Sequence, residues 1–150
     1  GQNGFINGLG QKVIWGQLGI GTQEVTRSLP TDVVGLTSGV SRIFASDNTT
    51  CALAGGTVKC WGLMITDESG GGQAFNSPQS IQGLPAGVTG AAVGYDQQCA
   101  IVSGTIKCRG GNSLGQLGNG EAGSVLTPTF EVAPPITVTL SLRYLPLVRR

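Results

Sequence analysis

Short runs of apolar residues separated by glycine-rich turns dominate the chain and predict β-strands. Residues 40–45 form one such run, and residues 51–53 and 58–61 form two more on either side of the pair Gly55-Gly56. Two apolar runs around a Gly-Gly pair predict a β-hairpin, because a tight two-residue turn needs positive φ angles that glycine adopts at little cost.

The predicted hairpin occurs twice. Residues 30–62 can be laid on residues 78–110 with a shift of 48 and no gap, and 12 of the 33 aligned positions are identical. The second copy uses Ser103-Gly104 at the turn. A period of this length is typical of propeller blades or solenoid turns, in which one unit buries its apolar face only by stacking on another.

Counting outward from each turn places the four cysteines opposite one another, Cys51 with Cys60 and Cys99 with Cys108. Such cross-strand neighbours have Cα atoms about 4.5 Å apart in the class of pair without hydrogen bonds. We therefore expect two disulfides within hairpins rather than long-range connections. The alternative is four reduced cysteines packed as small apolar side chains. No metal is expected, because close ligand pairs such as C-x2-C are lacking.

Disulfides would place the protein in an oxidising compartment, so we expect an extracellular or secreted protein. The glycosylation sequon Asn48-Thr49-Thr50, at a predicted surface bend, agrees with secretion. The chain opens at Gly1 without a basic and apolar leader, which fits a mature or excised product.

The composition supports an all-β protein. Glycine accounts for 26 of 150 residues while only 11% of residues are charged, which indicates many tight turns between short strands. The formal net charge is +1 and the basic residues are scattered, so nucleic acid is not an expected partner. No apolar stretch approaches the roughly 20 residues that a membrane span needs.

Motifs for catalysis are missing. The chain has no histidine, which excludes Ser-His-Asp and Cys-His arrangements. The eight carboxylates form no catalytic motif, and the glycines do not match the pattern of a phosphate-binding loop. We expect neither an enzyme nor a cofactor.

Two strings resemble a known family. Residues 51–62 (CALAGGTVKCWG) and 110–120 (GGNSLGQLGNG) are similar to repeats of the regulator of chromosome condensation family. A shortened copy opens the chain at residues 15–21 (WGQLGIG), where the Trp-Gly and Gly-Gln-Leu-Gly halves join directly. The resemblance covers roughly residues 13–132. It implies a β-propeller of about seven four-stranded blades that acts as a scaffold for protein contacts.

The sequence departs from that family at several positions. The histidine common before the Cys-Ala-Leu strand is Thr49 in one copy and Gln97 in the other, and Trp61 becomes Arg109. Residues 63–73 replace the Asn and Gly-Gln-Leu-Gly pattern, which we interpret as tolerated drift rather than a contact surface. These departures leave no basis for carrying over the nucleotide-exchange or chromatin roles of the family's nuclear member.

Propellers typically need four to eight blades, and 150 residues supply about three. We expect an all-β protein with propeller-type blades of four-stranded antiparallel sheet, an incomplete ring within one chain that is completed or extended by oligomerisation. The expected divisions are an N-terminal arm or small hairpin (1–12), about three repeats (13–133), and a C-terminal amphipathic strand and tail (134–150). One face of that strand is apolar and is the candidate assembly strand: Ile136, Val138, Leu140, Leu142 and Tyr144. It either closes the last blade or pairs with a neighbouring copy.

The sequence thus favours a secreted structural protein whose copies assemble into a ring, tube or extracellular filament. Its expected partners are copies of itself and possibly another protein. The alternative is a fragment of a larger secreted propeller that acts as a protein-binding module.

Overall fold

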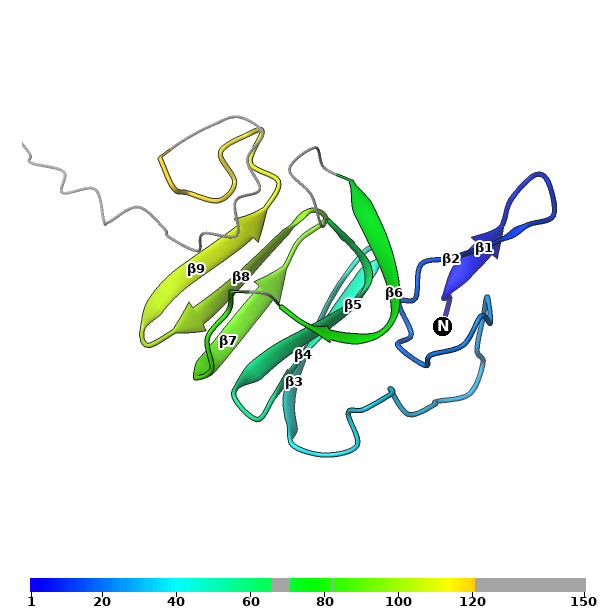
Figure 1. Cartoon of the computed structure of the whole chain (residues 1–150), viewed down its shortest axis with the longest axis horizontal. Coiled ribbons are helices and arrows are strands. Elements are labelled where there is room, and N and C mark those ends of the chain that lie inside the picture. Colours follow the sequence, from blue (N-terminus) through cyan, green and yellow to red (C-terminus); the bar gives the residue numbers. More distant parts are fainter. Residues whose placement is uncertain (66–70, 82, 121–150) are drawn as a thin grey trace, which may run out of the picture.

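The structure, a computed structural model, describes residues 1–65, 71–81 and 83–120 (Figure 1). These residues form three antiparallel sheets and no helix. A small hairpin, β1 (Gly4–Ile6) and β2 (Lys12–Ile14), comes first. The first blade is a four-stranded sheet of β3 (Val40–Ser46), β4 (Thr49–Ala54), β5 (Thr57–Ile65) and β6 (Gly72–Ser80). The second blade has three strands, β7 (Val88–Val93), β8 (Gln97–Val102) and β9 (Thr105–Gly110).

Both predicted hairpins are present. Gly55 and Gly56 turn the chain between β4 and β5 with φ angles of 56° and 74°. At the same place in the second blade Ser103 and Gly104 have φ angles of 51° and 79°, so a serine adopts the left-handed conformation that glycine favours. The register pairs Cys51 with Cys60 and Cys99 with Cys108.

The 48-residue repeat is visible in the backbone. Strands β7, β8 and β9 correspond to β3, β4 and β5, and the ladder is interrupted at the same point in both blades, between Val40 and Arg42 and between Val88 and Gly90. The equivalent of β6 would fall at residues 120–128, of which the structure describes only Gly120.

Each blade has two unlike faces, because side chains alternate across a strand. We call the face that carries the disulfide the cysteine face and the opposite one the alanine face. On the first blade the cysteine face presents Cys51, Leu53, Val58, Cys60 and Met64. On the second blade the alanine face presents Val88, Ala91, Val93, Ala100 and Val102.

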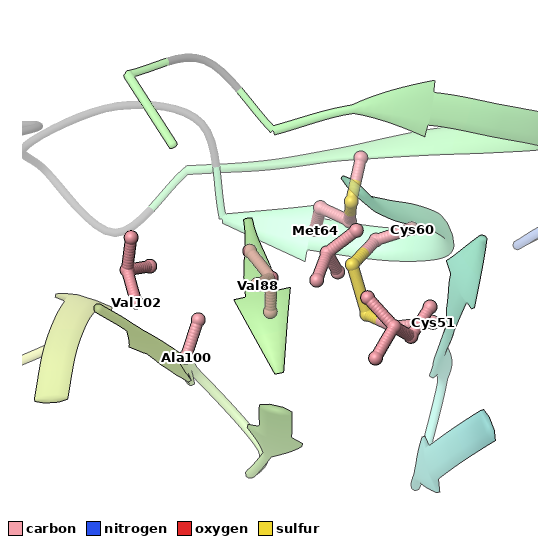
Figure 2. Packing of buried hydrophobic residues seen from close by; sticks show 8 residues of the cluster. Cys51, Cys60, Met64, Val88, Ala100 and Val102 are labelled. Atoms are coloured by element: carbon pink, nitrogen blue, oxygen red, sulfur yellow. A yellow bond between two sulfur atoms is a disulfide. The ribbon is translucent and has the colours of Figure 1, made fainter. Parts of the chain in front are cut away.

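The core lies between these two faces, where the cysteine face of the first blade packs on the alanine face of the second (Figure 2). Cys51 and Cys60 are fully buried, and Val88, Ala100 and Val102 are at most 5% exposed. Ile81 and Leu84, in the connection from β6 to β7, pack against the edge of this core. The blades thus bury their apolar surfaces by stacking, as expected for a repeat protein.

The N-terminal residues form hairpin β1–β2, which lies on the opposite side of the first blade from the second (Figure 1). The candidate assembly strand, Ile136, Val138, Leu140, Leu142 and Tyr144, lies outside the described residues. Among the described residues no helix is long and apolar enough to cross a membrane.

Candidate functional site

A loop of four residues, Gly16-Gln17-Leu18-Gly19, is held together by Asn3. The backbone carbonyl of Asn3 accepts from the N–H of Gly16 at 3.0 Å, and its side-chain oxygen accepts from the N–H of Leu18 at 3.1 Å. The amide nitrogen of the same side chain donates to the carbonyl of Glu24 at 2.9 Å. Asn3 is fully buried, and these bonds satisfy its polar groups.

Asn112 makes the same bonds in the next copy of the loop. Its carbonyl accepts from the N–H of Gly115 at 3.0 Å, and its side-chain oxygen accepts from the N–H of Leu117 at 3.0 Å. Two residues separate Asn112 from Gly115, whereas twelve separate Asn3 from Gly16, and those twelve carry hairpin β1–β2. The hairpin is therefore an insertion into the loop. Our interpretation of residues 15–21 as a shortened copy is wrong on this point, because Asn3 supplies the asparagine from a distance along the chain.

The loop closes over one edge of the first blade. Nε1 of Trp61 donates to the carbonyl of Gln17 at 2.8 Å, and the hydroxyl of Thr50 donates to the same carbonyl at 3.1 Å. A Cβ atom on Gly19 would lie 2.7 Å from Nε1 of Trp61, so only glycine leaves room for the indole. Trp61 is 1% exposed and fills the space between strand and loop.

The second blade carries Arg109 at the position of Trp61. Its Nε donates to the side-chain oxygen of Gln98 at 2.9 Å, and Gln98 in turn occupies the position of Thr50. Burial lowers the pKa of Arg109 from its ordinary value. A lowered arginine pKa still leaves the side chain charged near neutral pH, so this end of the second blade is polar where the first is apolar.

The predicted glycosylation site is not a free surface bend. The side-chain oxygen of Asn48 accepts from Nε2 of Gln17 at 3.1 Å, and the hydroxyl of Thr50 donates to the backbone carbonyl of Gln17. Asn48 is half-buried as a result.

The structure contains the two disulfides, Cys51–Cys60 and Cys99–Cys108, with Cα–Cα distances of 4.0 and 4.1 Å. They differ in environment although the local backbone is alike. The first is sealed between the blades, whereas in the second Cys99 is half-buried and Cys108 is 9% exposed.

Large apolar side chains remain exposed on two faces, one at each end of the stack. The cysteine face of the second blade presents Ile101 and Ile106, which are 43% and 54% exposed. The alanine face of the first blade presents Val40 and Ile43, which are 44% and 67% exposed, whereas Ala52 of this face is 2% exposed and the N-terminal loop lies over Thr50 and Trp61. Large exposed apolar side chains gathered on a sheet face are typical of an interaction surface. We take these two faces as the candidate functional site, and neither was singled out by sequence reasoning.

The described residues hold no group of three His, Cys, Asp or Glu side chains suited to a metal ion. An open hollow of about 400 Å³ is lined by aliphatic groups such as Leu18, Ile20 and Leu29 and about equally by polar groups, among which Arg27 carries a charged side chain. Arg27 is paired with Glu24 at 2.9 Å.

No protein-family model and no curated sequence matches the chain. Human WBSCR16 is similar in structure, with a TM-score of 0.54 and 21% identity over 83% of this chain and 33% of that one. The fold is that of RCC1-type propeller blades. Yeast RCC1 (Prp20), solved with Kap60 bound, matches with a TM-score of 0.44 and 20% identity over 64% of this chain and 26% of its own. The chain thus spans a third or less of the length of the solved structures that it matches.

Proposed function

We propose that this protein is a non-catalytic, protein-binding propeller module whose exposed blade faces receive the blade of a partner. The observation that carries the proposal is the cysteine face of the second blade, where Ile101 and Ile106 lie exposed beside a disulfide. Covering these side chains would stabilise a complex, because burying apolar surface is favourable by about 25 cal/mol per Å².

The partner's surface follows from the face itself. The two isoleucines are surrounded by residues with small side chains or none: Gly90, Ala92, Cys99 and Cys108. The centre of the face is therefore flat and uncharged. Such a surface suits another sheet packed face to face, at the spacing of about 10 Å seen for stacked sheets. We propose an extracellular setting, supported by the two disulfides, in which the module forms part of a larger blade assembly such as a ring, tube or filament.

The test is photo-crosslinking from defined positions. A benzoylphenylalanine residue replaces Ile106 in one variant and Leu9, which is 83% exposed at the tip of hairpin β1–β2, in a control. Each variant is irradiated in the fluid or extract from which the protein comes, and crosslinked peptides are identified by mass spectrometry. We expect a protein joined at position 106 and not at position 9. Equal crosslinking from both positions, or none from 106, would contradict the proposal.

A further inference from the structure

The contact between the two blades shows how one blade accepts another. The cysteine face of the first blade places Leu53 and Val58 against the alanine face of the second blade, which contributes Val88, Ala100 and Val102. All five side chains are at most 5% exposed. The contact joins two different faces, so it has a direction.

The exposed cysteine face of the second blade repeats the buried one residue by residue. A shift of 48 places Ile101 at the position of Leu53 and Ile106 at the position of Val58, with the disulfide in the same place. The side chains are alike in size and polarity, yet Leu53 and Val58 are 5% and 4% exposed while Ile101 and Ile106 are 43% and 54% exposed. The second blade therefore has the same apolar surface as the first, but no blade in the described part of the chain packs against its isoleucines.

The alanine face of the first blade, which is open at Val40 and Ile43 and covered by the N-terminal loop at Thr50 and Trp61, supplies the matching half. Val40 takes the position of Val88 and Ile43 that of Ala91, while Ala45, Ala52 and Ala54 take the positions of Val93, Ala100 and Val102. Beside this face, Val33 and Leu36 are half-buried at the positions of Ile81 and Leu84, which flank the internal contact.

Charge does not oppose a second contact of this kind. Lys107 lies on the alanine face of the second blade, opposite Ala100, and is half-buried within the existing stack. Lys59 occupies the same position on the alanine face of the first blade, opposite Ala52. A lysine keeps its ammonium group at the edge of such a contact while its aliphatic stem packs against apolar neighbours.

We infer that the cysteine face of the second blade binds the alanine face of the first blade of a second copy of this chain, head to tail. The inference rests on the proposed function and names its partner. Both halves of the contact are present in one chain, and their internal counterparts already pack together. The contact joins unlike faces, so a pair of copies keeps one free cysteine face at one end and one free alanine face at the other, and chains of copies grow until a ring closes.

Two single substitutions test the head-to-tail contact, each at one of its two faces. Ile106→Asp blocks the cysteine face and leaves the alanine face intact, whereas Ile43→Asp does the reverse. An aspartate in an apolar contact is expected to weaken the association about tenfold or more. The matched control is Leu9→Asp, which changes an exposed apolar residue outside both faces. Val40→Asp is a second variant of the alanine face, and circular dichroism checks that every variant is folded.

Analytical ultracentrifugation measures the outcome. We expect oligomers of wild type and Leu9→Asp whose size grows with concentration, and monomers of Ile106→Asp and of Ile43→Asp alone. Mixing those two should give a one-to-one dimer that grows no further, because only one complementary pair of faces remains. Monomeric wild type, or a mixture that stays monomeric while wild type assembles, would overturn the inference.

The second disulfide gives an independent measurement. In dilute protein we expect a phosphine to reduce Cys99–Cys108 faster than Cys51–Cys60, because the first blade's bridge is fully buried. At concentrations where copies assemble, the two rates should converge as the contact covers Cys99. Rates that do not change with concentration would overturn the inference.

The crosslinking experiment distinguishes this inference from the proposed function. A crosslink from position 106 to residues 40–45 of another copy supports both. A crosslink from position 106 to a different protein overturns the second copy as partner and leaves the proposed function standing. Absence of any crosslink at 106 removes both.

Discussion

At the residue scale, the fit between Gly19 and Trp61 controls how the N-terminal loop closes over the first blade. The indole donates to the carbonyl of Gln17, and the space that it needs exists because Gly19 has no side chain. Gly118 is the equivalent glycine in the second copy of the loop, with the same φ of 66°, and a Cβ atom added there would meet no described atom within 4 Å. The two glycines thus share a backbone conformation but differ in surroundings.

Substitution of these two glycines by alanine separates conformational strain from steric exclusion. Gly118→Ala should lower the free energy of unfolding by about 1–2 kcal/mol, the cost of a left-handed alanine. Gly19→Ala should cost about 1–3 kcal/mol more, because its Cβ overlaps the indole. Chemical denaturation followed by circular dichroism measures both. Equal losses would show that Trp61 moves aside freely.

The sequence predicted local pairs better than distant ones. Counting from Gly55-Gly56 located the cross-strand cysteines, because a two-residue turn fixes the register of its hairpin. The hydrogen bond that the N–H of Leu18 donates to the side chain of Asn3 was missed, since an inserted hairpin separates the two halves of the motif. The exposed state of Ile101 and Ile106 was not predicted either, because period-2 alternation gives the face of a side chain and not what covers it.

At the element scale, the loop closed by Asn3 is complete without its insertion. Asn112 makes the same bonds across only Ser113 and Leu114, and the loop there has the same turns. Hairpin β1–β2 is stabilised mainly within itself, by strand pairing and by the tilted contact of Phe5 and Trp15 at 5.1 Å between ring centroids.

Replacing residues 4–15 by Ser-Leu should leave the first blade folded. We expect the melting temperature to change by a few degrees at most, because the bonds of Asn3 and Trp61 are kept. Trp61 is then the only tryptophan, and its fluorescence should stay that of a buried indole. Asn3→Ala is the contrasting change and should cost about 1–3 kcal/mol, since it leaves buried groups unpaired. A shortened chain that exposes Trp61 would refute the account.

The two disulfide hairpins offer a second comparison between equivalent elements. Both bridges join residues nine apart, so by chain entropy each stabilises by about 2–3 kcal/mol. Replacing Cys99 and Cys108 by alanine should cost about that amount. Replacing Cys51 and Cys60 should cost about 1–2 kcal/mol more, because it also leaves a cavity between the blades. Thermal unfolding of the two double variants under non-reducing conditions measures the difference.

At the scale of the whole molecule, stability comes from the stacking of one blade on the next. The sequence predicted blades and an incomplete ring correctly, whereas the C-terminal strand at residues 136–144 stays a prediction. The stack ends in the alanine face of the first blade on one side and in the cysteine face of the second blade on the other. A monomer therefore exposes apolar side chains on both of these faces.

Neighbouring residues on β8 test this stacking, because Val102 points into the contact and Ile101 points away from it. In dilute protein Val102→Ala should cost about 2 kcal/mol and Ile101→Ala about 1 kcal/mol or less, although isoleucine loses more atoms. Urea unfolding at low protein concentration measures both. A larger loss for Ile101→Ala than for Val102→Ala in monomer would contradict the assignment of Val102 to the buried contact.

The closure of the N-terminal loop by Asn3 has a consequence for engineering. The backbone carbonyl of Asn3 accepts from the N–H groups of Trp15 and Gly16. These bonds hold together the two ends of the inserted segment, residues 4–15. Hairpin β1–β2 projects from that base away from both blades (Figure 1). Residues 7–10 at its tip are therefore a display position, where a foreign peptide would be presented to solvent while the stack beneath it keeps its contacts.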